Sequence, residues 1–306
     1  MVEGRTHRPI IQSSQCHQCD VCLRGCPAEL ISEYRQEGET SLRGTLYRGK
    51  LKGRPLKGKV SLPPCQEACP IHQDTRGYAS LIAQEKFREA LELIREVNPL
   101  PAVCGYNCHH PCEEVCLREG VDQPIPMRLL KRFVAEYERK GKKVRRRLPK
   151  KRHEKVLVIG SGPAGLTAAN DLSLLGFEVT LFEALPILGG MLAVGIPEFR
   201  LPRDILRTEI EGIRQLGVEM KTHHRFHFDR NGSTLQKLGF QAAFVSIGAH
   251  RSMRLNIPGE KIEGVIQGVE FLRNIHLGKR PRIGKRVAVI GGGNVAIDAA
   301  RSVIRL

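Results

Sequence analysis

The sequence predicts an α/β protein in which a small, cysteine-rich α-helical module precedes a domain built on a parallel β-sheet. All ten cysteines of the 306-residue chain lie before residue 117. In the second half, two apolar runs rich in β-branched residues each lead into a glycine-rich turn and then a helical pattern. Hydrophobic residues make up 41% of the chain and charged residues 26%, a globular balance, and no apolar run is long enough to cross a bilayer.

Residues 155–176 have the pattern of a dinucleotide-binding turn. Residues 155–160 form an apolar run typical of a strand, and residues 166–176 have a helical pattern. The turn between them consists of Gly160, Ser161, Gly162, Pro163, Ala164 and Gly165. Its glycines permit a tight turn, let the backbone approach a pyrophosphate at the helix N-terminus, and allow the helix to pack closely on the strand. We predict that all six residues bind a cofactor.

A second strand supplies the acidic residue of the same fingerprint. Residues 178–183 form another apolar run, which ends at Glu183, 18 residues beyond Gly165. A carboxylate in this place would bind the hydroxyl pair of a ribose. Because every part of the fingerprint is present, we favour a Rossmann-type nucleotide site over a glycine turn without a ligand.

The same pattern starts again near residue 285. Residues 285–301 predict a strand, a glycine turn and a helix, with Ala296 in place of the third glycine, which the fingerprint tolerates. The predicted cofactor-binding residues of this repeat are Gly291, Gly293, Asn294, Ala296 and Asp298. The repeat indicates the start of a nicotinamide-nucleotide domain inserted in a flavin domain. Since its second strand would follow Leu306, we expect a fragment, a natural truncation or one half of a split protein.

The cysteines form three groups with distinct spacing. They are Cys16, Cys19, Cys22 and Cys26; Cys65 and Cys69; and Cys104, Cys108, Cys112 and Cys116. The first group has the spacing of bacterial [4Fe–4S] ferredoxins. Disulfides are one alternative, but the N-terminus lacks the apolar core of a signal peptide, which predicts a reducing, cytoplasmic location. Zinc is another alternative, although its sites favour two ligand pairs separated by a longer loop.

The third cysteine group is expected on a broken, looped path. A glycine, an asparagine and a proline interrupt it, and one cluster cannot collect four thiolates from a continuous helix at this spacing. We therefore predict one cluster centred on Cys16, Cys19 and Cys22, and one or two clusters on the later six cysteines. Amphipathic helices are predicted over 77–97 and 124–140. The clusters would supply much of the folding energy of this small module.

The net charge of +17 belongs to two connecting stretches. Residues 43–59 carry seven Lys or Arg and no acid, and residues 131–155 carry thirteen against three Glu. Three interpretations compete: a solvated linker, a docking surface for an acidic protein, and contact with nucleic acid. Aromatic residues are scarce, at 5% with no Trp, and do not interleave these runs. This weakens the nucleic-acid interpretation.

Six motifs, in this order and spacing, make the chain resemble a known family. They are Asn98–Gly105, Cys112–Cys116, Val158–Gly165, Leu188–Leu192, Gly195–Pro202 and Gly291–Asp298. Residues 61–306 resemble the small (β) subunit of NADPH-dependent glutamate synthase and related flavoproteins, including the N-terminal part of dihydropyrimidine dehydrogenase. The resemblance implies FAD on the first nucleotide fold, NAD(P)H on the second and [4Fe–4S] clusters in the helical module. It also implies FAD contacts from Gly190, Met191, Arg200 and Gly248.

The chain departs from the family pattern at two places. Lys57 and Val60 stand where relatives have the first two cysteines of a run ending at Cys69. Lys131 stands where relatives often have a Gln or Glu that completes one cluster, and a protonated lysine is not a ligand. By the family pattern, one cluster is therefore short of ligands, which the first cysteine group would supply unless it holds a cluster of its own.

These observations predict five segments. They are residues 1–60, with the ferredoxin-like cysteine run and a basic linker; 61–141, the α-helical [4Fe–4S] module; 142–154, a basic linker; 155–284, an incomplete FAD-binding Rossmann domain; and 285–306, the start of an NAD(P)-binding domain.

The predicted function is that of an oxidoreductase subunit. It would pass electrons from NAD(P)H through FAD and the clusters to an acidic electron-transfer protein, such as a ferredoxin, or to a larger catalytic subunit. No catalytic residue is assigned, because hydride transfer does not require a protein acid or base. The rival hypotheses are a non-catalytic electron-relay or assembly subunit and a zinc-dependent nucleic-acid binder.

Overall fold

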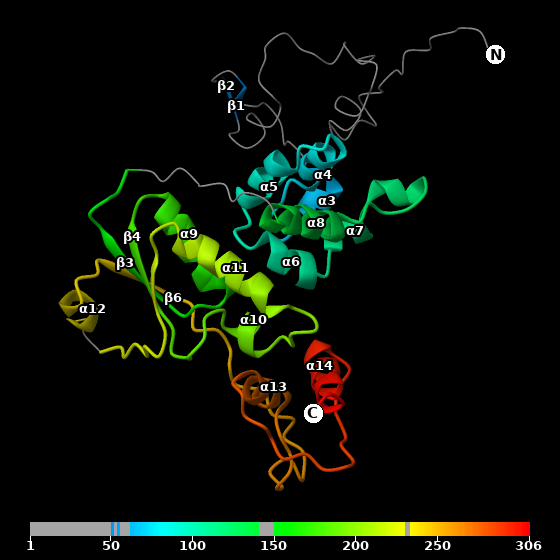
Figure 1. Cartoon of the computed structure of the whole chain (residues 1–306), viewed down its shortest axis with the longest axis vertical. Helices are drawn as coiled ribbons and strands as arrows, with labels where there is room; N and C mark the ends of the chain where they lie inside the picture. Colours follow the sequence, from blue (N-terminus) through cyan, green and yellow to red (C-terminus); the bar gives the residue numbers. More distant parts are fainter. Residues whose placement is uncertain (1–49, 52–53, 56–61, 141–149, 230–232) are drawn as a thin grey trace. The chain divides into compact units, whose positions relative to one another are not determined.

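The computed structural model describes residues 50–51, 54–55, 62–140, 150–229 and 233–306 (Figure 1). The chain divides into two compact units. The first unit consists of Met1–Val97 and His109–Glu138, and the second of Asn98–Cys108 and Arg139–Leu306. The predicted ligands Cys16, Cys19, Cys22 and Cys26 lie outside the described residues.

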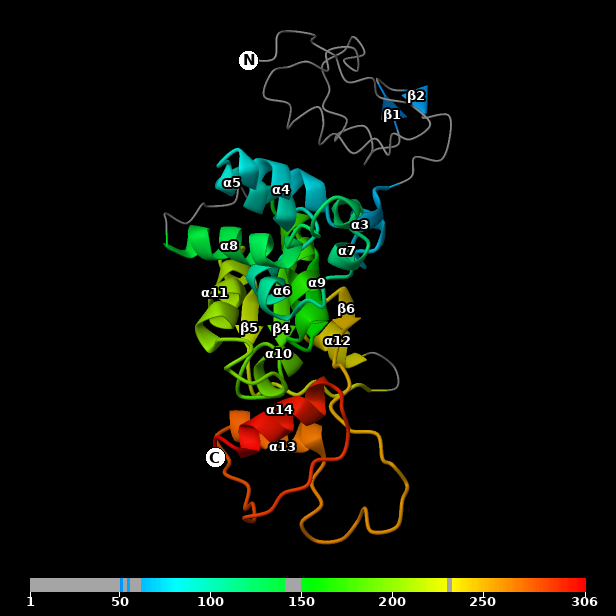
Figure 2. The ribbon, with the colours of Figure 1, turned by 90° about the vertical axis from the view of Figure 1, so that its right-hand side faces the viewer.

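The described part of the first unit is mainly α-helical. Its elements are β1 (Lys50–Leu51), which pairs antiparallel with β2 (Arg54–Pro55), α3 (Pro64–Glu67), α4 (Thr75–Ala83), α5 (Phe87–Arg95), α7 (Pro111–Glu114), η2 (Leu117–Gly120) and α8 (Met127–Lys140). Both views show α4 and α5 above α8 (Figures 1 and 2). The buried side chains of Tyr78, Leu91, Ile94 and Val134 form a core between these three helices.

The predicted helix over 77–97 is wrong in one respect, because two helices occupy this segment. Glu85 has a φ of 58°, and a left-handed residue cannot continue an α-helix. The chain therefore changes direction after α4, and α5 packs against α4. The predicted helix over 124–140 is confirmed as α8, which starts at Met127 because Pro124 and Pro126 precede it.

The third cysteine group follows the broken path that the sequence predicts. Cys104 lies in α6 (Pro101–Asn107), which belongs to the second unit, and Cys112 lies in α7 of the first unit. The helical path is interrupted between them, where His110 has a φ of 52°. The regular four-residue spacing of these cysteines is thus not the spacing of one helix.

The second unit contains a four-stranded parallel sheet. Its strands are β3 (Lys155–Ile159), β4 (Glu178–Phe182), β5 (Glu219–Lys221) and β6 (Ala242–Val245), in the order β5-β4-β3-β6. Its further helices are α9 (Pro163–Leu174), α10 (Met191–Val194), α11 (Arg203–Arg214), α12 (Ser233–Lys237), α13 (Gly268–His276) and α14 (Asn294–Val303). The first strand–turn–helix–strand unit predicted from the sequence is confirmed as β3, α9 and β4.

Helices cover both faces of this sheet, as parallel sheets require. Leu157, Ile159 and Phe182 form a cluster on one face, to which α12 contributes Leu235. Figure 1 shows α9 and α11 on the opposite side from α12. Four of the five residues in each of β3 and β4 are buried, which agrees with their nearly continuous apolar runs. No helix among the described residues has the length and apolar content that crossing a membrane requires.

The predicted strand at 285–290 does not form. These residues pair with no strand in the structure, although Gly291 and the helix that follows are where the pattern predicts them. A β-strand needs a neighbouring strand to satisfy its backbone groups, and the sheet of this unit ends at β6. The apolar pattern at 285–290 is therefore not sufficient to form a strand in this unit.

Substitution of Gly165 tests how closely α9 approaches the end of β3. A Cβ at this position would stand 1.9 Å from the carbonyl oxygen of Gly160. We expect Gly165→Ala to destabilise the chain by about 1–3 kcal/mol, the usual cost of overpacking, and to lower the midpoint of urea unfolding. Gly212→Ala is the matched control, because Gly212 lies within α11 and its Cβ would meet nothing within 4 Å. It should leave the stability unchanged or raise it by up to about 1 kcal/mol.

Candidate functional site

The first glycine turn leaves open space at the N-terminus of α9. Gly160 has a φ of 103°, and its N–H donates to the carbonyl oxygen of Phe182 at 2.8 Å. A Cβ on Gly162 would meet nothing within 4 Å, and no side chain caps the N-terminus of α9. The N–H groups of a first helical turn attract anions. Of the predicted cofactor residues, Gly160, Ser161, Gly162, Pro163, Ala164 and Gly165 all lie in this turn or the start of α9.

Glu183 holds this turn against the end of β4. Its side chain is buried, and one carboxylate oxygen, Oε2, accepts hydrogen bonds from the backbone N–H of Ser161 at 2.9 Å and from its hydroxyl at 2.6 Å. The other oxygen accepts from the N–H of Leu185 at 2.8 Å. The predicted ribose-binding acid is therefore fixed at the edge of the sheet, directly beside the turn.

The Leu188–Leu192 segment lies against the same turn. The N–H of Gly189 donates to the Ser161 hydroxyl at 3.0 Å. Gly190 has a φ of 52°, and a Cβ there would stand 2.7 Å from the Cα atom of Gly162. Met191 follows as the first residue of α10. The structure therefore brings the predicted Gly190 and Met191 to the predicted turn, at positions where the backbones approach too closely for a larger residue.

The end of β6 completes this edge of the sheet. The Ser246 N–H donates to the carbonyl oxygen of Ile159 at 2.8 Å, and its hydroxyl lies 3.1 Å from the carbonyl oxygens of Ile159 and Gly160. Gly248 follows with a φ of 65°. Nucleotides bind outside the carboxyl ends of parallel strands, and three such ends meet here. Open space, a buried acid and a glycine turn at one edge fit a flavin dinucleotide.

Arg200 and Asp298 pair with each other. The guanidinium Nη1 of Arg200 lies 2.6 Å from the Oδ2 atom of Asp298, whose side chain is buried in α14. The sequence assigned both residues to cofactor contacts, one for each nucleotide. The ion pair instead links the Gly195–Pro202 segment to the helix of the second repeat. No local pattern predicts a pair of residues 98 positions apart.

The second glycine turn is an exposed loop. Gly291 has a φ of 123°, and a Cβ on Gly293 would meet nothing within 4 Å. Asn294 and Ala296 lie in the first turn of α14. The turn and helix agree with the predicted pattern, but the preceding strand is absent and the turn does not belong to the sheet.

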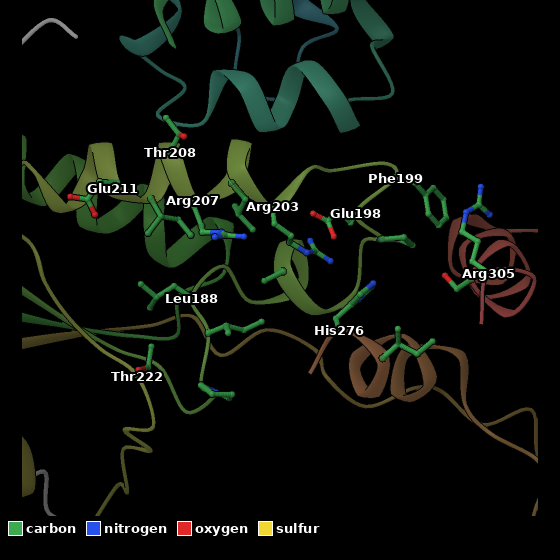
Figure 3. Close-up of a pocket in the computed structure, with 18 of the residues that line it drawn as sticks. Leu188, Glu198, Phe199, Arg203, Arg207, Thr208, Glu211, Thr222, His276 and Arg305 are labelled. Atoms are coloured by element: carbon green, nitrogen blue, oxygen red, sulfur yellow. The ribbon is translucent and has the colours of Figure 1, made fainter. Parts of the chain in front are cut away.

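A cavity of about 1160 Å³ lies along α11 (Figure 3). Arg203 and His276 line it, yet both side chains also bond the backbone around α10. Arg203 donates to the carbonyl oxygens of Leu192 and Ile196. The Nδ1 atom of His276 lies 2.8 Å from the carbonyl oxygen of Val194. Burial lowers the pKa of both side chains. None of the predicted cofactor-binding residues lines this cavity.

Four of the six described cysteines lie in the first unit. Cys65 lies in α3 and Cys69 just after it; Cys112 lies in α7 and Cys116 just before η2. Helices α3 and α7 are in contact. None of the six described cysteines forms a disulfide, which agrees with thiolate ligands. Cys112 is buried.

Tyr78 lies in α4, which contacts α3, the helix that carries Cys65. The side chain of Tyr78 is fully buried, and its hydroxyl donates to the carbonyl oxygen of Met127 at 3.0 Å. Burial raises the pKa of Tyr78 well above its usual value, and the negative charges of Cys112, Cys69, Glu113 and Cys65 raise it further. Sequence reasoning missed Tyr78, because an aromatic residue on an amphipathic helix looks like ordinary core.

The chemistry and placement of the first-unit thiols fit an iron–sulfur cluster. Cys65 and Cys112 lie in α3 and α7, which contact each other, and Cys69 and Cys116 follow these helices. A cubane takes each thiolate on a different iron, so its ligands need not surround one atom. Within the described ranges, no group of three His, Cys, Asp or Glu side chains lies close enough to hold a single metal ion.

Glu209 fixes the helix that carries Cys104. Its two carboxylate oxygens accept hydrogen bonds from the N–H groups of Ala102 and Val103, at 2.7 and 2.9 Å. N–H groups at the start of a helix have no partner within the helix, and no side chain of the neighbouring sequence caps α6. Pro101 at the first turn predicts the helix start, but its acidic cap comes from α11, about a hundred residues away.

Two family models match the chain. Residues 57–143 match the one described as "Dihydroprymidine dehydrogenase domain II, 4Fe-4S cluster". Residues 154–306, half of the chain, match the one described as "Pyridine nucleotide-disulphide oxidoreductase". The matches confirm the predicted order of an iron–sulfur module before an α/β flavoprotein domain, and with it the predicted cofactors: [4Fe–4S] clusters, FAD and NAD(P)H.

Curated relatives agree with these matches. The chain is 42% identical over 287 residues to the NADP(+)-dependent formate dehydrogenase subunit beta of Moorella thermoacetica, covering 84% of this chain and 40% of that protein. It is 41% identical over 248 residues to the NADPH-Fe(3+) oxidoreductase subunit beta of Geobacter sulfurreducens, covering 79% of this chain and 37% of that protein. It is 35% identical over 246 residues to the NAD-dependent dihydropyrimidine dehydrogenase subunit PreT homolog of Salmonella typhi, covering 78% of this chain and 58% of that protein.

The chain spans about two fifths of the length of the first two relatives. Its resemblance to iron–sulfur flavoproteins, predicted from six sequence motifs, is confirmed by both family matches and by these relatives. The chain therefore belongs to the pyridine nucleotide-disulphide oxidoreductase family and carries, before its α/β domain, an iron–sulfur domain of the dihydropyrimidine dehydrogenase type.

Proposed function

We propose that this chain is an oxidoreductase subunit that moves electrons between NAD(P)H, FAD and [4Fe–4S] clusters and delivers them to a partner subunit or a ferredoxin. One observation carries the proposal: a sheet edge with a glycine turn and a buried acid, and a unit with four cysteines in or beside contacting helices, occur in the same chain. The likeness to the small subunit of glutamate synthase, and a cytoplasmic location that keeps the thiols reduced, are part of this proposal.

The residues of the sheet edge would bind and orient the flavin nucleotide. When bound, FAD accepts a hydride from NAD(P)H and releases single electrons. The first turn of α9 would face the pyrophosphate, and Glu183 would accept from ribose hydroxyls while Ser161 keeps it in place. Gly190 and Met191 would lie along the dinucleotide. In the first unit, Cys65, Cys69, Cys112 and Cys116 would be ligands; in the second, Cys104 and Cys108.

One observation favours a second candidate, an electron-relay subunit without nicotinamide binding. The segment before Gly291 forms no strand, and the second glycine turn is exposed outside the sheet. A nucleotide site of this type needs the turn to be fixed between a strand and a helix. In this case, the second unit would still bind FAD, and the electrons would come from another protein.

The acceptor is proposed to be acidic. The basic run 131–155 is not uniformly exposed, because Lys131 is buried and the Arg152 guanidinium lies 4.7 Å from the centre of the Phe177 ring. Lys150 and Lys151 are exposed and have no partner among the described residues, so they are available to a negatively charged protein. Complementary charge of this kind mainly raises the rate at which two proteins associate.

Addition of NAD(P)H to the anaerobically purified chain tests the function. We expect a brown protein with at least about four iron atoms per chain, an EPR signal after reduction, and bleaching of the flavin absorbance at about 450 nm. Flavin bleached by dithionite but not by NAD(P)H would support the relay subunit. A chain that takes up neither iron nor FAD on reconstitution would disprove both proposals.

Glu183→Gln should weaken FAD binding. The amide would keep one acceptor oxygen, and its NH₂ group would face the N–H of Ser161 or of Leu185. Loss of charged hydrogen bonds costs about 1.5–3 kcal/mol, which corresponds to an FAD dissociation constant raised about 10- to 100-fold. The control is Glu178→Gln at the exposed start of β4, for which we expect an unchanged FAD titration. Equal effects in both variants would contradict the assigned role.

The rate of electron transfer to an acidic ferredoxin should fall severalfold as ionic strength rises from about 0.01 to about 0.15 M, since the screening length falls from about 30 to about 8 Å. The double change Lys150→Glu and Lys151→Glu should slow the reaction at low salt. The same double reversal at the exposed Lys279 and Lys285 is the control. Identical electron-transfer rates in both double variants, or a rate independent of salt, would contradict the proposal that Lys150 and Lys151 contact the acceptor.

A further inference from the structure

Lys131 occupies a core position of α8. The buried residues on this helix are Met127, Lys131, Val134 and Ala135, whose spacing is that of a single helix face. The other three are apolar, whereas Lys131 brings an ammonium group and is 7% exposed. A charge at such a position is costly unless an anion compensates it.

The described residues provide no such anion. Within them, the only hydrogen bond, ion pair or cation–π contact of the Lys131 ammonium group is with the Tyr78 ring, whose centroid lies 5.9 Å from Nζ. The charge of Glu113 acts on Tyr78, but the Glu113 carboxylate already has other partners. It accepts from the N–H of Arg128 at 2.8 Å and lies 3.4 Å from the Nδ1 atom of His110.

Helices that carry thiols pack beside the same ring. Helix α3, which carries Cys65, contacts both α4, the helix of Tyr78, and α7, the helix of Cys112. The N–H of Arg128 in α8 donates to Glu113 of α7, and the hydroxyl of Tyr78 donates to the carbonyl oxygen of Met127 in α8. The buried ammonium group of Lys131 and the cysteines of α3 and α7 therefore belong to helices that pack together. Bound to a [4Fe–4S] cluster, the thiolates of these cysteines would form part of a group with a net negative charge.

We propose that Lys131 is the electrostatic partner of the [4Fe–4S] cluster held by the cysteines of α3 and α7, and that its positive charge raises the reduction potential of that cluster. The inference rests on the proposed function, because it requires a cluster at these cysteines. Reduction adds one electron and so makes the cluster more negative, which a fixed positive charge in a low-dielectric interior favours. No bond forms or breaks in this step. Lys131 is thus a positioning and tuning residue, not a ligand.

Potentiometric titration of the EPR signals of the anaerobically purified full chain tests this inference. We expect Lys131→Gln to move the midpoint potential of one cluster to a more negative value, at an unchanged iron content. Lys131→Arg keeps the charge and should keep the wild-type potential. The control is Lys86→Gln, which removes the same charge from an exposed position of the same unit and should leave the potential unchanged, because water screens it.

An iron-loaded Lys131→Gln protein with the wild-type potential would overturn the inference, as would a Lys131→Arg protein shifted as far as Lys131→Gln. If both Lys131→Gln and Lys131→Met fail to retain the cluster, Lys131→Arg decides: retention supports a requirement for positive charge, and loss overturns it. A wild-type chain that binds no iron would overturn the proposed function as well, so the two failures are distinguishable.

Discussion

Gly165 lies so close to the carbonyl oxygen of Gly160 that no larger residue fits between α9 and the end of β3. This contact sets the geometry of the whole sheet edge. It brings the uncapped first turn of α9 to the carboxyl ends of β3 and β4, where Ser161 meets the carboxylate of Glu183. The same serine hydroxyl accepts from the N–H of Gly189, which positions the segment that follows. The glycine contact and the buried acid thereby bring together segments up to about 30 residues apart at the carboxyl end of the sheet.

The first unit is organised around buried polar and charged groups. Beside apolar side chains such as Leu91, Ile94 and Val134, it buries Tyr78, Lys131 and the thiol of Cys112. Small metal-binding domains commonly gain folding energy from their metal, because the ligands are not gathered in the unfolded chain. The buried charge of Lys131 and the thiolates would then compensate each other only when the cluster is bound, which couples cluster binding to the stability of the fold.

The third cysteine group is divided between the two units. Glu209 accepts hydrogen bonds from the start of α6, so Cys104 and Cys108 belong to the unit with the glycine turn, whereas Cys112 and Cys116 belong to the helical unit. A group that is continuous in the sequence thus contributes thiols to both units.

The local architecture could be predicted from the amino-acid sequence alone. Apolar alternation, glycine positions and cysteine spacing predict β3, α9 and β4, the broken path of the third cysteine group and the order of the two modules. These features follow from backbone conformation and from neighbours a few residues away, which the sequence displays directly.

Contacts between residues that are distant in the sequence became known only from the fold. It buried Lys131, paired Arg200 with Asp298 and divided the predicted helix 77–97 at Glu85. It also left residues 285–290 without a strand partner. Burial, ion pairing and strand pairing each depend on groups far away in sequence. No local pattern encodes these contacts, because their free energy arises only when the distant partner is in place.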